Sequence, residues 1–129
     1  MEKPKYTLEF FQLLTGKAYN GMEVVPQATV ILRLCEKQLI GTANGKGTLE
    51  TLFEAIKNAS GIDMKLEGSI DFSSWIDFSS SPPSERVEAT VGVAHNDYLY
   101  VGSAYGGGML ESSVNAFVDA LNNIHLRNG

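Results

Sequence analysis

The sequence contains very little cysteine: Cys35 is the only one in 129 residues, so no internal disulfide can form. That usage fits a reducing cytoplasm. No run of apolar residues approaches the roughly 20 that a membrane-spanning helix needs, and the first residues lack the apolar segment of a secretory signal. We therefore expect a cytoplasmic protein that has no membrane partner.

Positive charge is also scarce. Ten Lys and Arg residues stand against fifteen Asp and Glu residues, which gives a net charge of -5, and the basic residues form no cluster. Such a chain is a poor candidate for binding nucleic acid or an anionic membrane. The remaining composition, 43% hydrophobic and 19% charged, is typical of a folded protein. The length predicts a single domain over residues 1–129.

Residue types that build catalytic or metal centres are few and scattered. His95 and His125 have no cysteine or carboxylate at the spacing of metal ligands. Cys35 stands next to Glu36 at a strand end, where we expect it to pack. No arrangement of serine, histidine and acid for nucleophilic catalysis is visible. The sequence thus predicts no catalytic residue, no metal and no cofactor in this domain.

The chain repeats itself at an offset of 61. Residues 28–59 placed on 89–120 without a gap give 11 identities in 32 positions, where average composition gives about two by chance. The repeat includes one glycine-rich phrase, which reads GTANGKGTLE at 41–50 and GSAYGGGMLE at 102–111. We infer an internal duplication, with unit one at about residues 5–61 and unit two at about 64–126.

Each unit shows the same order of hydrophobic patterns. Strands are predicted at residues 6–14, 28–34, 38–43, 69–78, 88–94 and 98–104, and loops at 17–26 and 79–85. After each third strand the apolar residues change to helical spacing, from Leu49 and from Leu110 onward. The predicted fold class is α+β: two tandem βββα units with a pseudo-twofold internal repeat, and mostly antiparallel sheets covered by two helices.

The first glycine phrase contains Lys46, as a nucleotide-binding loop would. The Walker sequence G-x-x-x-x-G-K-[ST] requires a hydroxyl residue directly after the lysine, but Gly47 stands there, and unit two has Gly107 in the lysine's place. The dinucleotide sequence G-x-G-x-x-G fails because Glu50 occupies the third glycine position. A sharp turn from strand to helix is sufficient to explain these glycines.

Both phrases immediately precede a predicted helix. A helix N-terminus has unpaired N–H groups and a partial positive charge, so it suits a small carboxylate. Glu50 or Glu111, in the first helical turn, could meet an ammonium group, and Leu49 or Met109 an aliphatic chain. The spacing therefore permits an aliphatic amino acid as ligand. A domain whose glycines only form turns, with Thr48 as a helix cap, explains the same residues.

Four segments resemble the C-terminal regulatory domain of the 2-isopropylmalate synthases and the related citramalate synthases. The segment 45–56, GKGTLETLFEAI, is similar to the family's G-N-G-P-V-D-A-L-F-x-A-I. The segment 110–122, LESSVNAFVDALN, is similar to D-I-V-E-A-S-x-x-A-Y-x-x-A-L-N. The other two are YTLEFFQLLTG at 6–16 and PQATVIL at 26–32. The resemblance covers nearly the whole chain in order.

The resemblance implies a domain of two βββα units that dimerises and binds leucine or isoleucine, the end product of the pathway. In that family, binding feeds back on a separate TIM-barrel acyltransferase, which condenses acetyl-CoA with a 2-oxo acid. This chain is similar only to the regulatory part. The implied partners are a branched-chain amino acid, a second copy of the chain, and a catalytic barrel if the chain is part of a longer one.

The resemblance also implies positions that contact the effector. In the two loops they are Gly45, Lys46, Gly47, Thr48, Leu49, Gly106, Gly107 and Met109. The strand before the second hairpin would contribute pocket walls from among Ile70, Phe72, Trp75 and Phe78. Two residues depart from the family pattern: Thr48 replaces a proline, and Gly108 replaces an acidic residue. The second departure leaves open whether both loops bind. A ligand-free structural dimerisation module and a small enzyme are the alternative classes.

Overall fold

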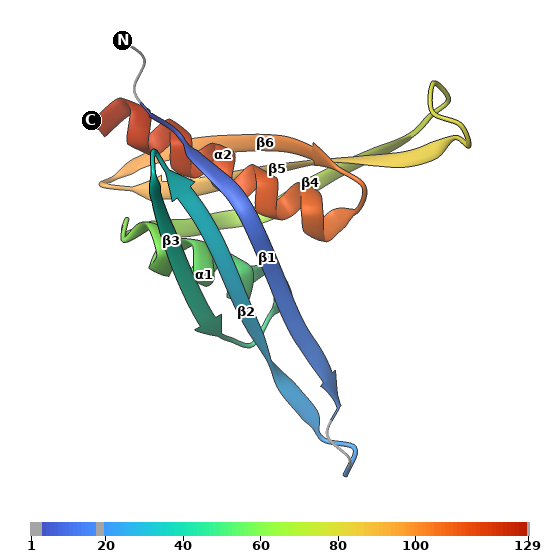
Figure 1. Cartoon of the computed structure of the whole chain (residues 1–129), viewed down its shortest axis with the longest axis horizontal. Coiled ribbons are helices and arrows are strands. Elements are labelled where there is room, and N and C mark those ends of the chain that lie inside the picture. Colours follow the sequence, from blue (N-terminus) through green and yellow to red (C-terminus); the bar gives the residue numbers. More distant parts are fainter. Residues whose placement is uncertain (1–3, 18–19, 129) are drawn as a thin grey trace. The chain divides into compact units, whose positions relative to one another are not determined.

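The computed structural model describes residues 4–17 and 20–128. The chain divides into two compact units, Met1–Asp63 and Met64–Gly129. Unit one contains β1 (Tyr6–Lys17), β2 (Glu23–Leu34), β3 (Lys37–Asn44) and α1 (Thr48–Ser60) (Figure 1). Unit two contains β4 (Lys65–Asp77), β5 (Ser84–His95), β6 (Tyr98–Gly106) and α2 (Met109–Asn128). This order confirms the predicted α+β class. Neither helix, as far as the structure describes the chain, is long and apolar enough to cross a membrane.

The strands of each unit form one antiparallel sheet with the second strand in the middle. The duplication extends to the strand register, since Val30 pairs with Gly41 in unit one and Val91 pairs with Gly102 in unit two. The strands β2 and β5, and likewise the two helices, begin 61 positions apart. The units are therefore structural repeats as well as sequence repeats.

Each helix buries a single apolar stripe against the second and third strands of its own sheet. Leu52 and Ile56 of α1 are fully buried, as are Phe117 and Leu121 of α2. Burying a side chain of this size stabilises the fold by about 1.5–3 kcal/mol. The α1 helix ends at Gly61, which adopts the left-handed conformation with φ 72°. The predicted stripes are confirmed.

A glycine in each unit lets the helix backbone approach the third strand. A β-carbon added to Gly41 would collide with the backbone oxygen of Ala55 and the backbone nitrogen of Ala59. The unit-two counterparts of these three residues are Gly102, Ala116 and Ala120. All six are identities of the repeat, so part of the repeated pattern reports tight helix packing rather than ligand binding.

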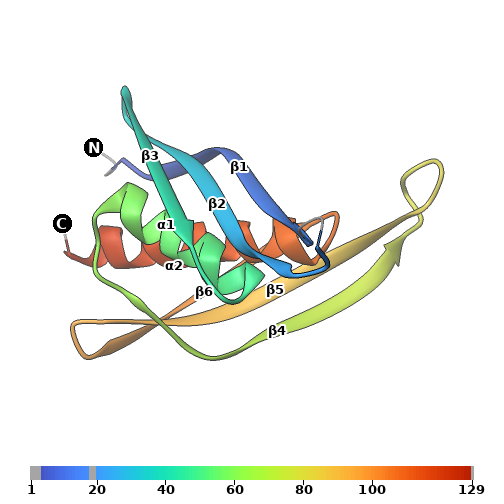
Figure 2. The same cartoon turned by 90° about the horizontal axis from the view of Figure 1, so that it is seen from below.

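The first two strands of each unit are longer than the sequence predicts. β2 begins at Glu23 rather than at residue 28, and β5 begins at Ser84. Both predicted loops are therefore too long, and residues 18 and 19 of the first lie outside the described residues. β2 pairs with β1 as far as Lys17, and Figure 2 shows the β4–β5 hairpin extending past the end of β6. A hairpin that extends past the third strand lacks the alternating burial that identifies strands in sequence.

The predicted packing role of Cys35 is wrong. Cys35 is exposed and lies in the tight turn between β2 and β3, with φ 58°. A turn of two residues leaves no room for its side chain to reach the core, which lies between the sheet and α1.

Candidate functional site

The first glycine loop, residues 45–47, connects β3 to α1 and is held at both ends. The Gly45 N–H donates to the Pro26 carbonyl oxygen at 3.1 Å, which ties the loop to β2. The Gly47 carbonyl oxygen accepts from the Thr51 N–H at 3.0 Å and from the Thr51 hydroxyl at 2.5 Å. Thr51 is fully buried. We call this segment loop one; it is fixed by contacts on both its strand side and its helix side.

The N-terminus of α1 lacks a side-chain cap. Its N-cap residue is Gly47, in an extended conformation, and no side chain hydrogen-bonds at this position. The predicted capping role of Thr48 is therefore wrong, because Thr48 is already the first helical residue. The first-turn N–H groups and the helix dipole leave partial positive charge at loop one. The carboxylate of Glu50, in the first turn, lies against Gly47 and so faces part of this charge.

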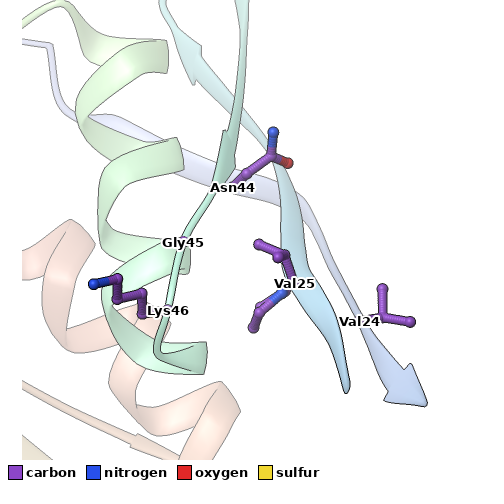
Figure 3. Close-up of a pocket in the computed structure, with 6 residues that line it drawn as sticks. Val24, Val25, Asn44, Gly45 and Lys46 are labelled. Carbon is purple, nitrogen blue, oxygen red and sulfur yellow. The ribbon is translucent and has the colours of Figure 1, made fainter. Parts of the chain in front are cut away.

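A pocket of ≈ 430 Å³ opens beside loop one (Figure 3). Small-molecule sites typically measure about 300–1,000 Å³. The lining residues come from β2, β3 and loop one, and they are Val24, Val25, Pro26, Asn44, Gly45 and Lys46. The strand register produces this grouping, because Gln27 pairs with Asn44 and so brings the start of β2 beside the end of β3.

The pocket combines an apolar surface with polar groups. Val24 and Val25 are 42% and 57% exposed, so an aliphatic ligand could still cover them. Asn44 supplies an amide that can both donate and accept. In Figure 3 the Lys46 side chain extends away from the two valines, so its ammonium group would reach a ligand only by rotating about its side-chain bonds. An amphipathic carboxylate fits this chemistry.

The pocket contains Gly45 and Lys46 of the predicted effector contacts, whereas Gly47, Thr48 and Leu49 do not line it. Sequence reasoning missed Val24 and Val25 because they fell in a predicted loop. The pair of adjacent β-branched residues before Pro26 is the signal that could have identified them as strand.

The second glycine loop, residues 107–108, repeats the helix-side contacts of loop one, and we call it loop two. The Gly107 N–H donates to a carboxylate oxygen of Glu111 at 3.1 Å. The Gly108 carbonyl oxygen accepts from the Ser112 N–H at 3.1 Å and from its hydroxyl at 2.8 Å. Gly106, a predicted effector contact, is buried, and a β-carbon added to it would collide with the Ser112 nitrogen. Met109, another predicted contact, is exposed. An internal carboxylate therefore sits at loop two.

The predicted pocket walls in β4 do not share one face of the sheet. Phe72 is half-buried and pairs with the buried Ala89, on the face that α2 covers. Trp75 pairs with Arg86 on the opposite face, and its ring lies edge-to-face with Tyr105 at 5.6 Å. These walls cannot line one pocket within unit two.

The other predicted residues of this strand lie in different surroundings. Ile70 is half-buried within an irregular section between Glu67 and Asp71. Phe78 is 79% exposed and lies just beyond the end of β4. Gly68 adopts φ 70° inside the irregular section, which breaks the alternation of faces and explains why the sequence pattern there is unclear.

Comparison with known proteins identifies the family. Residues 1–125 match the LeuA allosteric (dimerisation) domain, so the chain belongs to this family. It is 30% identical over 125 residues to the 2-isopropylmalate synthase of Pseudoalteromonas atlantica, covering 97% of this chain and 23% of that protein. It is 30% identical over 123 residues to the enzyme of the same name from Pyrococcus furiosus, covering 95% and 22%. The match to the Sediminispirochaeta smaragdinae enzyme is 28% over 117 residues, covering 91% and 22%.

The chain spans less than a quarter of the length of these curated relatives. It corresponds to their regulatory domain, and the resemblance read from the four sequence segments is confirmed.

Proposed function

We propose that this chain is the amino-acid-binding, feedback-regulatory domain of an acyltransferase of the 2-isopropylmalate synthase kind. Its effector is leucine or isoleucine, and the effector binds in the pocket beside loop one. The observation that supports this most strongly is a pocket that joins the apolar surface of Val24 and Val25 to loop one, the segment that leads into the uncapped N-terminus of α1.

The expected energetics are those of a weak metabolite site. A hydrogen bond to the effector carboxylate contributes about 1.5–3 kcal/mol, and covering the valine surface with a leucine-sized chain adds about 1.5–3 kcal/mol. The carboxylate of Glu50 lies against Gly47, where it could accept the effector's ammonium group. Ordering the ligand offsets part of this gain. The remainder corresponds to dissociation constants on the order of a millimolar to tens of micromolar.

The regulatory output requires the longer protein. We propose that the chain forms a homodimer, with the effector at or near the dimer interface, and that binding is coupled to a TIM-barrel domain that condenses acetyl-CoA with a 2-oxo acid in the cytoplasm. Coupling of this kind typically amounts to about 1–3 kcal/mol. The family description and the names of the relatives support this assignment. Partly exposed valines beside the pocket also fit a site completed by a second chain.

Leucine is favoured over isoleucine as the effector because the relatives are named 2-isopropylmalate synthase rather than citramalate synthase. The two amino acids differ only in branching, which a pocket discriminates by about 1–3 kcal/mol. The pocket is open on the single chain, so its complete shape depends on whatever covers Val24 and Val25.

Calorimetric titration with leucine, isoleucine and valine tests the proposal. We expect at least one of them to bind, and Val25→Ser to weaken that binding by about tenfold because it removes two apolar carbons from the pocket surface. Val101→Ser is the matched control, since Val101 is 54% exposed against 57% for Val25 and lies in unit two. The proposal fails if none of the three amino acids binds at millimolar concentration.

A ligand-free structural dimerisation module is the second candidate. Two observations favour it, because neither arrangement needs a ligand. The Glu111 carboxylate accepts a hydrogen bond from loop two, and Phe72 and Trp75 lie on opposite faces of the sheet. Thermal unfolding with and without branched-chain amino acids separates the candidates. A bound effector raises the unfolding temperature by an amount that grows with the logarithm of its concentration once this exceeds the dissociation constant, whereas a module without a site shows no shift.

A further inference from the structure

Each sheet has two edge strands, β1 and β3 in unit one and β4 and β6 in unit two. An edge strand presents unpaired N–H and C=O groups that can pair with another chain, and proteins usually protect such edges. β1 and β4 contain irregularities, which lie between Leu8 and Phe10 and between Glu67 and Asp71. These irregularities bend the strands and disrupt further pairing. β3 and β6 instead pair with their neighbours without a register shift, so their outer edges need another protection.

The outer edge of β6 is covered by α2. Three polar side chains, spaced four positions apart on one face of the helix, reach it: Asn115, Asp119 and Asn123. The Asn115 Nδ2 donates to the Tyr105 carbonyl oxygen at 3.3 Å. The Asp119 carboxylate accepts from the Ser103 N–H at 2.9 Å. The Asn123 Nδ2 donates to the Val101 carbonyl oxygen at 2.7 Å. A strand of another chain could pair with β6 only by displacing these side chains.

The outer edge of β3 has less cover from α1. The residues 61 positions earlier than the three of α2 are Glu54, Asn58 and Ile62. The Asn58 Nδ2 donates to the Thr42 carbonyl oxygen at 2.8 Å. Glu54 carries a carboxylate, which has no N–H to donate to a carbonyl oxygen. Ile62 has an apolar side chain and follows the end of α1 at Ser60. Among the described residues, α1 therefore covers this edge with a hydrogen bond only at Thr42.

The uncovered part of β3 centres on Ile40. The Thr42 carbonyl points away from β2, and backbone groups alternate along an antiparallel strand, so the N–H and C=O of Ile40 point the same way. The Ile40 side chain is 62% exposed. It ends an apolar row across the face of the sheet opposite α1, because Phe10 pairs with Ile31 and Ile31 pairs with Ile40. The corresponding row of unit two is Glu67, Gly92 and Val101.

We propose that two copies of this chain associate through β3, antiparallel about Ile40, so that two three-stranded sheets become one sheet of six strands. The partner is a second copy because the family is defined by a dimerisation domain. The pairing is symmetric, as a two-fold dimer requires: Ile40 lies opposite Ile40, and Gln38 opposite Thr42. The only charged residue of β3, Lys37, lies opposite Ala43, so no like charges meet. The inference rests on the homodimer of the proposed function and does not depend on the effector.

Substitution at Ile40 tests this interface. Sedimentation equilibrium gives the dissociation constant of the dimer of the unmodified chain. Ile40→Lys places two ammonium groups opposite each other and should raise that constant by at least about tenfold. Val101→Lys is the matched control, since Val101 is the counterpart of Ile40 on the covered edge and is 54% exposed. Its dissociation constant should stay within about twofold of the unmodified value. Circular dichroism verifies that both variants keep their secondary structure.

Disulfide formation supplies a direct measure of proximity. Opposite Cα atoms in a hydrogen-bonded antiparallel pair lie about 5.5 Å apart, a distance that a disulfide can span. Ile40→Cys in a Cys35→Ser background should therefore form a covalent dimer under mild oxidation, whereas Val101→Cys in the same background should stay uncrosslinked.

The outcomes separate this inference from the proposed function. Unchanged dimerisation of Ile40→Lys, or no more covalent dimer from Ile40→Cys than from Val101→Cys, would overturn the inference and leave the proposed homodimer intact. An unmodified chain that sediments as a monomer would refute the homodimer and this inference with it. Calorimetric binding of the branched-chain amino acids decides the effector independently of both.

Discussion

The contact between α1 and β3 at Gly41 offers a sharp test of how this fold is packed. Replacing Gly41 by alanine adds one methyl group, and the helix backbone occupies its place. The added carbon would lie 2.8 Å from the Ala59 β-carbon and nearer still to the Ala55 oxygen and the Ala59 nitrogen. A flexible side chain could move away, but backbone atoms move only if the whole helix shifts.

The expected cost follows from this geometry. Overpacking a core typically destabilises a protein by about 1–3 kcal/mol, occasionally more. Because the obstacle is backbone on two successive helical turns, we expect Gly41→Ala to lose about 3 kcal/mol of unfolding free energy. Gly92→Ala is the matched control: its added carbon would meet the Glu67 oxygen at 3.3 Å and a Leu99 methyl at 3.5 Å. We expect its effect to stay within about 1 kcal/mol, since such contacts need only small adjustments.

Urea unfolding followed by far-UV circular dichroism measures both variants. The single tryptophan, Trp75, lies in unit two, so its fluorescence reports that unit separately. If the units unfold independently, Gly41→Ala shifts the dichroism transition and leaves the fluorescence transition in place. A loss below about 1 kcal/mol, equal to that of Gly92→Ala, would show that α1 does not pack on Gly41 as described.

Two further predictions concern a salt bridge and a buried hydroxyl. The Arg33 Nε donates to Glu9 at 3.0 Å, and this hydrogen bond holds the pKa of the Glu9 carboxyl below its ordinary value of 4.5. The salt bridge therefore stabilises the fold fully above pH 4.5, and this stabilisation should vanish as pH falls through the lowered pKa. Urea unfolding of the unmodified chain and of Glu9→Gln at several pH values measures the difference in stability. A difference that grows on acidification would contradict the prediction. Thr51→Val removes the hydroxyl that donates to the Gly47 carbonyl and changes the side-chain volume little. We expect the free energy of unfolding, measured by chemical unfolding, to fall by about 0.5–1.5 kcal/mol, and leucine to bind more weakly. Unchanged stability and affinity would contradict a role for this hydrogen bond in holding loop one.

The order of elements was predictable because the relevant signals are local. The apolar residues that recur at helical spacing from Leu49 and from Leu110 indicate a helix with one buried face. The pattern is the same whatever that face packs against. The left-handed residue Gly61 ends α1 at the predicted end of unit one. The turn at Cys35 was misread because a free cysteine usually packs in a core, and only the length of the connection, two residues, shows that it cannot.

The strand ends could not be predicted in the same way. Val24 belongs to β2 because it pairs with Gly16 of β1 beyond the reach of β3 and α1, and Val25 lies beside it, where the register shifts between Leu14 and Gly16. Side chains there are partly exposed on both faces, so no alternation marks the strand. The unclear pattern of β4 has a related cause, since the irregular section at Gly68 changes which face each following residue occupies.

The sequence by itself determined the duplication, the βββα order, the family and the two glycine phrases, because each is carried by residues close together along the chain. Only the tertiary structure decided which phrase lies beside a pocket. That choice depends on the pairing of Gln27 with Asn44, which brings Val24 and Val25 next to Lys46, and on the hydrogen bond from Gly107 to Glu111. Contacts between residues some twenty positions apart depend on strand register. Whether a first-turn glutamate accepts a hydrogen bond from a particular N–H depends on its rotamer. Neither the register nor the rotamer is encoded in a local sequence pattern.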